Sequence, residues 1–211
     1  MANQNQQKWF ELFSKTKGLN PWLKALGGEE KLKGLFPSRF GPDSADLVPT
    51  KDEKGNHRFF RAFELLEPGQ VKCLVIGQDP YPDESLATGV AFLVPPGSKS
   101  QSLDILLEKD GLFPKEHEND LLAWSIKKGV LLINAALTFS KDRSLKNRLD
   151  GWEGFIKAVI RLLREIKPDL EIIAFGKHAG DVAKRAVITC CIHPTARGMT
   201  KEKFKESWNK R

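Results

Sequence analysis

The chain has 211 residues, of which 40% are hydrophobic and 29% are charged, and its formal net charge is +7. This size and composition predict one globular domain over residues 1–211 and exclude a transmembrane helix, because no apolar run approaches about 18 residues. The positive charge favours a polyanionic partner, although many basic proteins bind no nucleic acid. The first residues lack a basic start followed by a long apolar core, so we expect no secretory signal and a cytoplasmic protein.

Strand and helix patterns alternate along most of the chain. Before them, residues 27–58 are rich in Gly, Pro, Lys and Asp, which predicts an irregular surface segment. Short apolar runs predict strands at 71–76, 130–133, 171–175 and 187–192. Helical patterns lie at 102–108, 120–127, 152–166 and 177–185. This alternation, with runs that are apolar on both faces, predicts a single-domain α/β/α sandwich around a central four-stranded parallel sheet.

The three cysteines, Cys73, Cys190 and Cys191, lie in the predicted strands. Adjacent residues of a strand point to opposite faces, and the chain has no CxxC motif. We therefore expect buried, reduced thiols rather than a metal or cluster site.

A glycine or a polar residue follows each predicted strand. The residues in these positions are Gly77 to Asp79, Asn134, Gly176 and His193. Each one has an ordinary structural explanation as a cap, turn or loop residue. Because parallel sheets bind ligands beyond the carboxyl ends of their strands, an Asp, an Asn and a His at one edge favour an assembled site.

Five motifs stand in a characteristic order: GQDPY (77–81), GVAF (89–92), GVLLINAALT (129–138), IIAFGKHA (172–179) and HP (193–194). Their order and approximate spacing resemble the uracil-DNA glycosylase superfamily, most closely family 1, over about residues 60–200. The resemblance implies a monofunctional DNA glycosylase that hydrolyses the N-glycosidic bond of uracil, or of a related modified pyrimidine, in base excision repair. It also implies single-stranded or duplex uracil-containing DNA as the partner, a monomer, no membrane, no metal and no cofactor. A proteinaceous glycosylase inhibitor is a further partner that the resemblance suggests.

The resemblance gives two residues catalytic roles that fit the chemistry. Cleavage of the bond between deoxyribose and base builds positive charge on the sugar and negative charge on the departing base. Asp79 matches the carboxylate that stabilises the sugar cation and orients the attacking water. His193, as a neutral imidazole, matches the donor to the base oxygen that gains charge.

Four further residues match the family's base-binding positions. An enzyme that acts on one base must take it out of the stack, and Phe92 matches the residue that stacks on the flipped base. Asn134 matches the amide that pairs with the base edge, since an amide offers a donor beside an acceptor. Tyr81 matches the side chain that crowds C5 and refuses the methyl group of thymine, and Gln78 lines the pocket through its backbone amide.

The DNA backbone has its own candidate contacts. The segment VPPGSKSQS (94–102) resembles the proline-rich loop that clamps DNA in the family. In the third strand's loop a lysine replaces the usual serine and would contact phosphate by charge. The candidate phosphate contacts are Ser98, Ser100, Ser102, Lys177 and Arg197.

The loop after the HP motif departs from family 1. The family has a longer loop here, carrying a leucine that enters the duplex and holds the base out. In this chain only Thr195 and Ala196 separate Pro194 from Arg197, so we expect no intercalating wedge at this place. Leu145, in the loop after the second strand, is the apolar residue placed to supply one instead.

Three interpretations remain open. The first is an active glycosylase on uracil or a related pyrimidine in DNA. The second is a catalytically weak glycosylase fold that binds DNA or a partner, which the short loop and Pro82, in place of the family's usual histidine, would permit. The third is a hydrolase that acts on a modified base or a free nucleoside. Base release from a uracil-containing oligonucleotide, compared with free deoxyuridine, distinguishes them.

Overall fold

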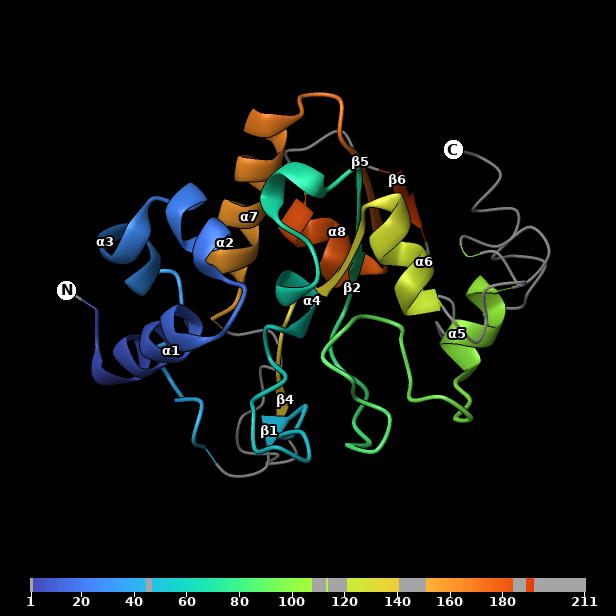
Figure 1. The fold of residues 1–211 in the computed structure, drawn as a ribbon, viewed down its shortest axis with the longest axis horizontal. Helices are drawn as coiled ribbons and strands as arrows, with labels where there is room; N and C mark the ends of the chain where they lie inside the picture. The colour runs from blue at the N-terminus through green and yellow to red at the C-terminus, as the bar shows by residue number, and fades with distance from the viewer. Residues whose placement is uncertain are drawn as a thin grey trace.

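The computed structural model describes residues 2–44, 47–107, 113, 121–140, 151–183 and 189–191, the last of these ranges by its backbone alone. Its centre is a sheet of four parallel strands (Figure 1). The strands are β2 (Cys73–Gly77), β3 (Val130–Asn134), β5 (Glu171–Phe175) and β6 (Thr189–Cys191). The predicted four-stranded parallel sheet is confirmed, because each apolar run contains or overlaps one of these strands.

The order of the strands places β2 at the point where the chain changes direction across the sheet. The order is β3-β2-β5-β6, so the chain passes from β2 to one side and then returns to the other. In open α/β sheets, ligands bind at such a switch point, outside the carboxyl ends of the strands. The segment that begins at Gln78 leaves the sheet at this place.

Helices cover both faces of the sheet, which confirms the α/β/α sandwich (Figure 1). In front of the sheet in Figure 1, α4 (Arg61–Glu64) and α6 (Leu121–Lys128) pack against β3. Behind it, α8 (Lys177–Ala183) packs against β5 and α7 (Glu153–Ile166) packs against α8. The described ranges after residue 60 also contain η1 (Pro68–Gln70) and α5 (Gln101–Leu106).

The four predicted helices correspond to α5, α6, α7 and α8, with ends that differ by at most two residues. In α7 the buried residues, among them Phe155, Val159 and Leu163, recur at helical spacing on one face. None of the helices in the described ranges is long and apolar enough to span a membrane.

The N-terminal helices extend the core with aromatic side chains. They are α1 (Gln4–Lys15), α2 (Asn20–Ala25) and α3 (Gly28–Lys33). Trp9 of α1 packs edge-on against Trp152, which precedes α7, with ring centroids 4.9 Å apart. Large aromatic rings bury much apolar area each, so this contact ties α1 firmly to the sandwich. The core runs from α1 to α8 as one cluster.

The prediction of an irregular surface segment at residues 27–58 was wrong in part. This segment contains α3 and the short strand β1 (Leu47–Val48), and its side chains Leu32, Phe36 and Val48 are at most 2% exposed. Some of the Gly and Lys residues that suggested a surface loop are exposed, such as Lys31, Lys54 and Gly55, while widely spaced apolar residues reach the core.

β1 pairs antiparallel with β4 (Phe139–Ser140), which no sequence pattern predicted. Strands of two residues are too short to show an alternating pattern. Val48 and Phe139, together with Ala87, form a small cluster against which Tyr81 packs. The two-stranded ribbon therefore supports a residue that the sequence placed in the base pocket.

Candidate active site

A cavity of about 200 Å³ opens at the carboxyl end of β2. The sequence assigned five of its lining residues to catalysis or base binding: Gln78, Asp79, Tyr81, Phe92 and Asn134. They come from three separate segments, which the sheet order and the following loops bring together. All the predicted catalytic and base-binding residues in the described ranges thus line one cavity. His193 lies outside those ranges.

Gly77 at the end of β2 makes room for two of these side chains. It is paired with Asn134 in the β2–β3 register. A Cβ atom on Gly77 would lie 2.4 Å from Asn134 Oδ1 and 3.1 Å from Phe92 Cζ. Only a residue without a side chain lets the amide and the ring approach the backbone this closely.

Backbone hydrogen bonds continue the β2–β3 pairing beyond the strands. The amide of Ala135 donates to the carbonyl of Gly77 at 2.9 Å, and the amide of Ala136 donates to that of Gln78 at 3.0 Å. The start of the loop that carries Asp79 is therefore held against the segment that follows Asn134. This arrangement fixes the position of the loop that carries Asp79 relative to Asn134.

Phe92 has an unusual backbone conformation. Its φ of 65° lies in the left-handed region, which bulky side chains rarely adopt. The ring is 6% exposed and packs edge-on against Phe175, with centroids 5.4 Å apart. The amide of Ala91 donates to the carbonyl of Leu132 at 3.2 Å, which attaches the loop to β3. Such conformations persist where the surroundings over-determine them and cluster at ligand sites.

Tyr81 is held at both ends of its side chain. Its ring packs on the cluster that includes Val48 and Phe139, while its hydroxyl lies 3.1 Å from the carbonyl of Phe92 and 2.7 Å from Ser100 Oγ. Burial raises the pKa of the Tyr81 phenol, the hydrogen bond with Ser100 lowers it, and the negative charge of Asp104 raises it; the net shift is upward. The phenol is therefore neutral at physiological pH.

Sequence reasoning missed Phe59, Thr88 and Leu137, which also line the cavity. Phe59 is 3% exposed, and its ring packs edge-on against Trp9 with centroids 5.1 Å apart. His57 stacks on it at 5.0 Å with an interplanar angle of 26°. The wall of the cavity therefore rests on the N-terminal aromatic core, and no local sequence signal predicts that contact.

Gly89, in the loop before Phe92, lets this loop lie close against the neighbouring backbone at the cavity. Its φ is 84°, and a Cβ atom there would lie 2.1 Å from the carbonyl oxygen of Arg58. The loop thus rests directly on the backbone of the segment that carries Phe59.

The candidate phosphate contacts lie in different surroundings. Ser100 and Ser102 are each 8% exposed, and Ser100 Oγ accepts from the amide of Leu103 as the N-cap of α5. Ser102 also lines the cavity at the end of β2. Lys177 is exposed at the start of α8, directly after β5 and therefore at the carboxyl edge. Ser98 is half-buried, Arg197 lies outside the described ranges, and the roles of all five candidates stay predictions.

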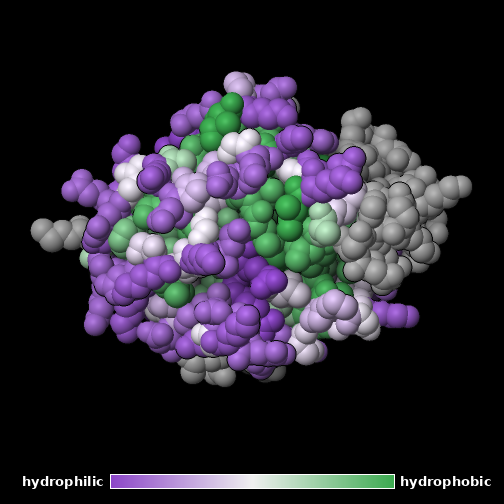
Figure 2. All heavy atoms as spheres, in the orientation of Figure 1, coloured by the Kyte–Doolittle hydropathy of each residue, from purple (hydrophilic) through white to green (hydrophobic). Residues whose placement is uncertain are grey.

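A second cavity, of about 790 Å³, adjoins the first and shares Thr88 and Val90 with it. Figure 2 shows a hydrophobic area near the centre of this face with hydrophilic residues below it. Arg58 Nε donates to the carbonyl of Thr50 at 2.9 Å, so this guanidinium braces the turn at 51–57. The basic residues that line the second cavity are Lys54, Arg58, Arg61 and Lys99. Asp52, Glu53 and Asp104 also line it, so its four cations exceed its three carboxylates by only one.

Among the described residues, no group of three or more His, Cys, Asp or Glu side chains is arranged to hold a metal ion. Cys73 is half-buried against the core, and Cys190 and Cys191 lie in β6. That the three thiols are reduced stays a prediction.

Comparisons with known proteins agree with this architecture. The family model described as the uracil DNA glycosylase superfamily matches residues 63–211. The uracil-DNA glycosylase 1 of Bacteroides fragilis is 30% identical over 178 residues, which are 80% of this chain and 77% of that protein. The uracil-DNA glycosylase of Exiguobacterium sibiricum is 32% identical over 139 residues, and this match spans 63% of the chain and 60% of the relative's length.

Solved structures show the same fold. The wild-type UNG of Nitratifractor salsuginis superposes with a TM-score of 0.63 at 20% identity, over 99% of this chain and 96% of that chain. The mimivirus uracil-DNA glycosylase gives a TM-score of 0.58 at 25% identity, over 93% and 70% of the two chains. The family model covers well over half of the sequence, and the cavity lies at the switch point of the shared sheet. On these grounds the chain belongs to the uracil DNA glycosylase superfamily.

Proposed function

We propose that this protein is a monofunctional glycosylase that hydrolyses the N-glycosidic bond of uracil in DNA. The observation that carries the proposal is the convergence of Asp79, Tyr81, Phe92 and Asn134 on one cavity at the carboxyl end of β2. The cavity of about 200 Å³ is smaller than the roughly 300–1,000 Å³ typical of drug-sized ligands, which suits a single base.

The arrangement supplies the groups that the reaction needs. Phe92 stacks on the flipped base and Asn134 reads its edge, while Tyr81 closes the space beside C5. As the bond from C1′ to N1 breaks, its electron pair leaves with the base and the sugar becomes cationic. Asp79 stabilises that cation and orients a water whose oxygen bonds to C1′. The water's proton passes to solvent, the base anion takes up a proton, and the products are free uracil and an abasic sugar.

Base release from a single-stranded oligonucleotide that carries one uracil tests this proposal. We expect uracil release by the wild-type protein and little release from free deoxyuridine. Release from deoxyuridine at a similar rate would point to a nucleoside hydrolase. If the folded protein bound the oligonucleotide but released no base, the protein would be a DNA-binding module and not a glycosylase.

The same assay with Asp79→Asn tests the electrostatic role of the carboxylate. The change keeps the shape of the side chain and removes its charge, so folding should be intact. Removal of one preorganised group typically costs about 3 kcal/mol of transition-state stabilisation, and we expect single-turnover release to fall by at least about a hundredfold. Glu84→Gln removes a charge from an exposed residue of the same loop and should have little effect. If the two variants behaved alike, Asp79 would not be the catalytic carboxylate.

DNA is accordingly the proposed partner, in single strands or duplexes. A mimivirus UNG variant has been solved in complex with UGI. This chain is 26% identical to that variant, and the match covers 90% of this chain and 70% of the variant's chain. We propose that a protein inhibitor of this kind also binds this site, with the enzyme acting as a monomer. Titration of base release with the inhibitor tests the first statement and sedimentation tests the second.

A further inference from the structure

The hydroxyl of Tyr81 belongs to a short chain of hydrogen bonds that ends at the first turn of α5. The hydroxyl donates to the carbonyl of Phe92 at 3.1 Å. A carbonyl oxygen cannot donate, so this bond uses the one hydrogen of the phenol. The contact of 2.7 Å with Ser100 must then be donated by Ser100, whose Oγ in turn accepts from the amide of Leu103 at 3.3 Å.

Every hydrogen of this chain is thereby assigned, and two of its members are buried beside the half-buried Tyr81. Ser100 is 8% exposed and Phe92 is 6% exposed. Buried hydrogen bonds of this kind fix side chains because breaking one leaves an unsatisfied polar atom. The opposite end of the Tyr81 ring packs on the cluster that contains Val48 and Phe139. Ser100 and the carbonyl of Phe92 thus fix the hydroxyl end of the ring together, and of the two groups only the Ser100 hydroxyl can be removed by a substitution.

We propose that Ser100 is a positioning residue for base specificity, acting through Tyr81 rather than as a phosphate contact. The inference rests on the proposed function, because it concerns the space beside C5 of the base. Without the Ser100 hydroxyl, the Tyr81 phenol keeps only its hydrogen bond to the carbonyl of Phe92, so the ring is held less tightly beside the base. The protein then tolerates a larger group at C5.

The first test is the ratio of single-turnover release rates for uracil and for 5-substituted uracils, namely 5-fluorouracil, thymine and 5-hydroxymethyluracil, in matched single-stranded oligonucleotides. We expect Ser100→Ala to lower the preference for uracil by about twofold to tenfold, the range of one hydrogen bond. In a Tyr81→Phe background, which lacks the hydroxyl, Ser100→Ala should change the ratio no further. An equal additional reduction in that background would show that Ser100 acts elsewhere.

Two variants separate this role from the others open to Ser100. Glycine is nearly as good an N-cap as serine but has no hydroxyl, so Ser100→Gly should lower the ratio as Ser100→Ala does. Recovery of the wild-type ratio in Ser100→Gly would mean that only the helix cap matters. Ser98→Ala, in the same loop, should leave the ratio unchanged. A Ser100→Ala variant that slows every substrate equally would indicate a direct role in DNA binding, and the proposal would fail.

The contact between Ser100 and Tyr81 can also be tested without an activity assay, because Tyr81 is the only tyrosine in the chain. A phenol titration by absorbance, or by ¹³C-labelled tyrosine, therefore reports on this residue alone. Because the Ser100 hydrogen bond lowers the Tyr81 pKa, Ser100→Ala should raise it. An unchanged pKa in an active protein would overturn the contact with Ser100. A wild-type protein that releases no base would instead overturn the proposed function, and the specificity role with it.

Discussion

Asn134 places its side-chain oxygen over the backbone of Gly77, where a Cβ atom would come within 2.4 Å of it. The two residues are partners across β2 and β3, so strand register itself sets the amide at the mouth of the cavity. The base reading proposed for Asn134 would therefore depend on Gly77, a residue with no side chain of its own to contact the base.

Gly77→Ala tests this dependence. The backbone of Gly77 is not left-handed, and Asn134 Oδ1 is the movable end of a side chain, so the variant should fold with a small change in Tm. The amide and the Phe92 ring must shift, and we expect base release to fall by about tenfold to a hundredfold. Gly34→Ala is the matched control, since a Cβ atom there meets nothing within 4 Å. Wild-type activity in Gly77→Ala would show that the position of Asn134 is not critical.

Asn134→Asp tests which base the cavity reads. A carboxylate accepts a hydrogen bond from the exocyclic amine of cytosine, whereas the native amide offers a donor and an acceptor to uracil. We expect weaker uracil release together with new release of cytosine. Profiling both bases in single strands measures this, and a general decrease with no new substrate would mean that Asn134 does not contact the base edge.

The sequence predicted most of the sheet because short, mainly apolar runs at β2, β3 and β5 alternate with helical patterns, which favours buried parallel strands. The sequence also predicted which residues lie at the carboxyl edge of the sheet, since these residues directly follow the end of each strand. The wall at Phe59 and the ribbon of β1 and β4 were not predictable in this way. They depend on contacts between segments far apart in the chain, such as Phe59 with Trp9.

The contact between Tyr81 and Ser100 shows the same limit within the site. Both residues were candidates, one for the base and one for phosphate, and neither motif indicates that their hydroxyls meet at 2.7 Å. Ser100 meets Tyr81 while it also caps the first turn of α5, a contact between two segments that neither motif predicts alone.

His57 makes stability depend on pH near the cavity wall. Burial lowers its pKa, as does the positive charge of Lys51, while Asp43 raises it, and the net shift is downward. A histidine with a lowered folded pKa contributes stability above its unfolded pKa of about 6.5, and that contribution disappears as pH falls through the folded value. Tm should therefore fall less between pH 7.5 and pH 5.5 in His57→Gln than in the wild type. His178→Gln, at an exposed position of α8, should follow the wild type; equal falls in all three proteins would contradict the assignment.

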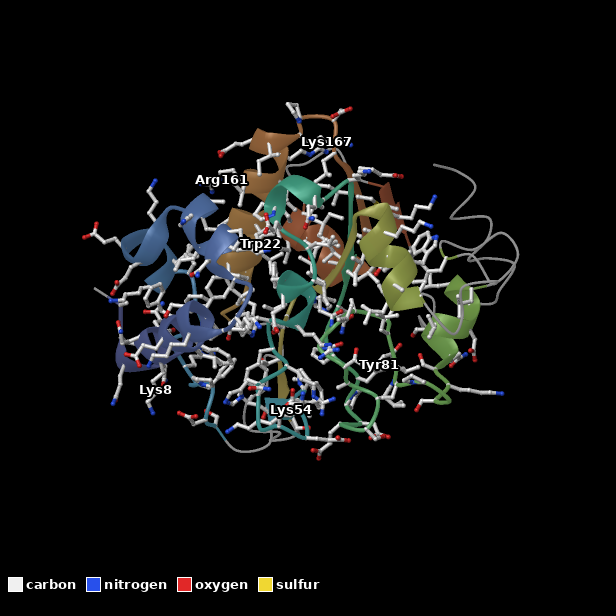
Figure 3. All side chains as sticks on the ribbon, in the orientation of Figure 1. Lys8, Trp22, Lys54, Tyr81, Arg161 and Lys167 are labelled. Carbon is white, nitrogen blue, oxygen red and sulfur yellow. The ribbon has the colours of Figure 1, made fainter. Side chains whose placement is uncertain are left out.

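DNA binding should weaken strongly as salt rises, because the positively charged side chains described at the carboxyl edge of the sheet are suited to bind DNA phosphates. Removing one cation that neutralises a phosphate should reduce the slope of log affinity against log salt by about one. We expect this reduction in Lys177→Gln. Lys167→Gln is the control, since Lys167 lies at the opposite end of the molecule from Tyr81 (Figure 3). Equal slopes in the two variants would remove Lys177 from the interface.

The short sequence separation between Pro194 and Arg197 predicts a preference among DNA forms. Extracting a base from a duplex costs a few kcal/mol of unpairing and unstacking, which a side chain inserted into the vacated space partly offsets. Only Thr195 and Ala196 stand where a longer loop would carry such a side chain. We therefore expect faster release of uracil from single strands and from weak U:G pairs than from U:A pairs. Single-turnover rates on the three matched substrates, at two salt concentrations, measure this. Equal rates on all three would mean that another segment supplies the wedge, and a Leu145→Ala variant that then slowed only the duplex substrates would identify it.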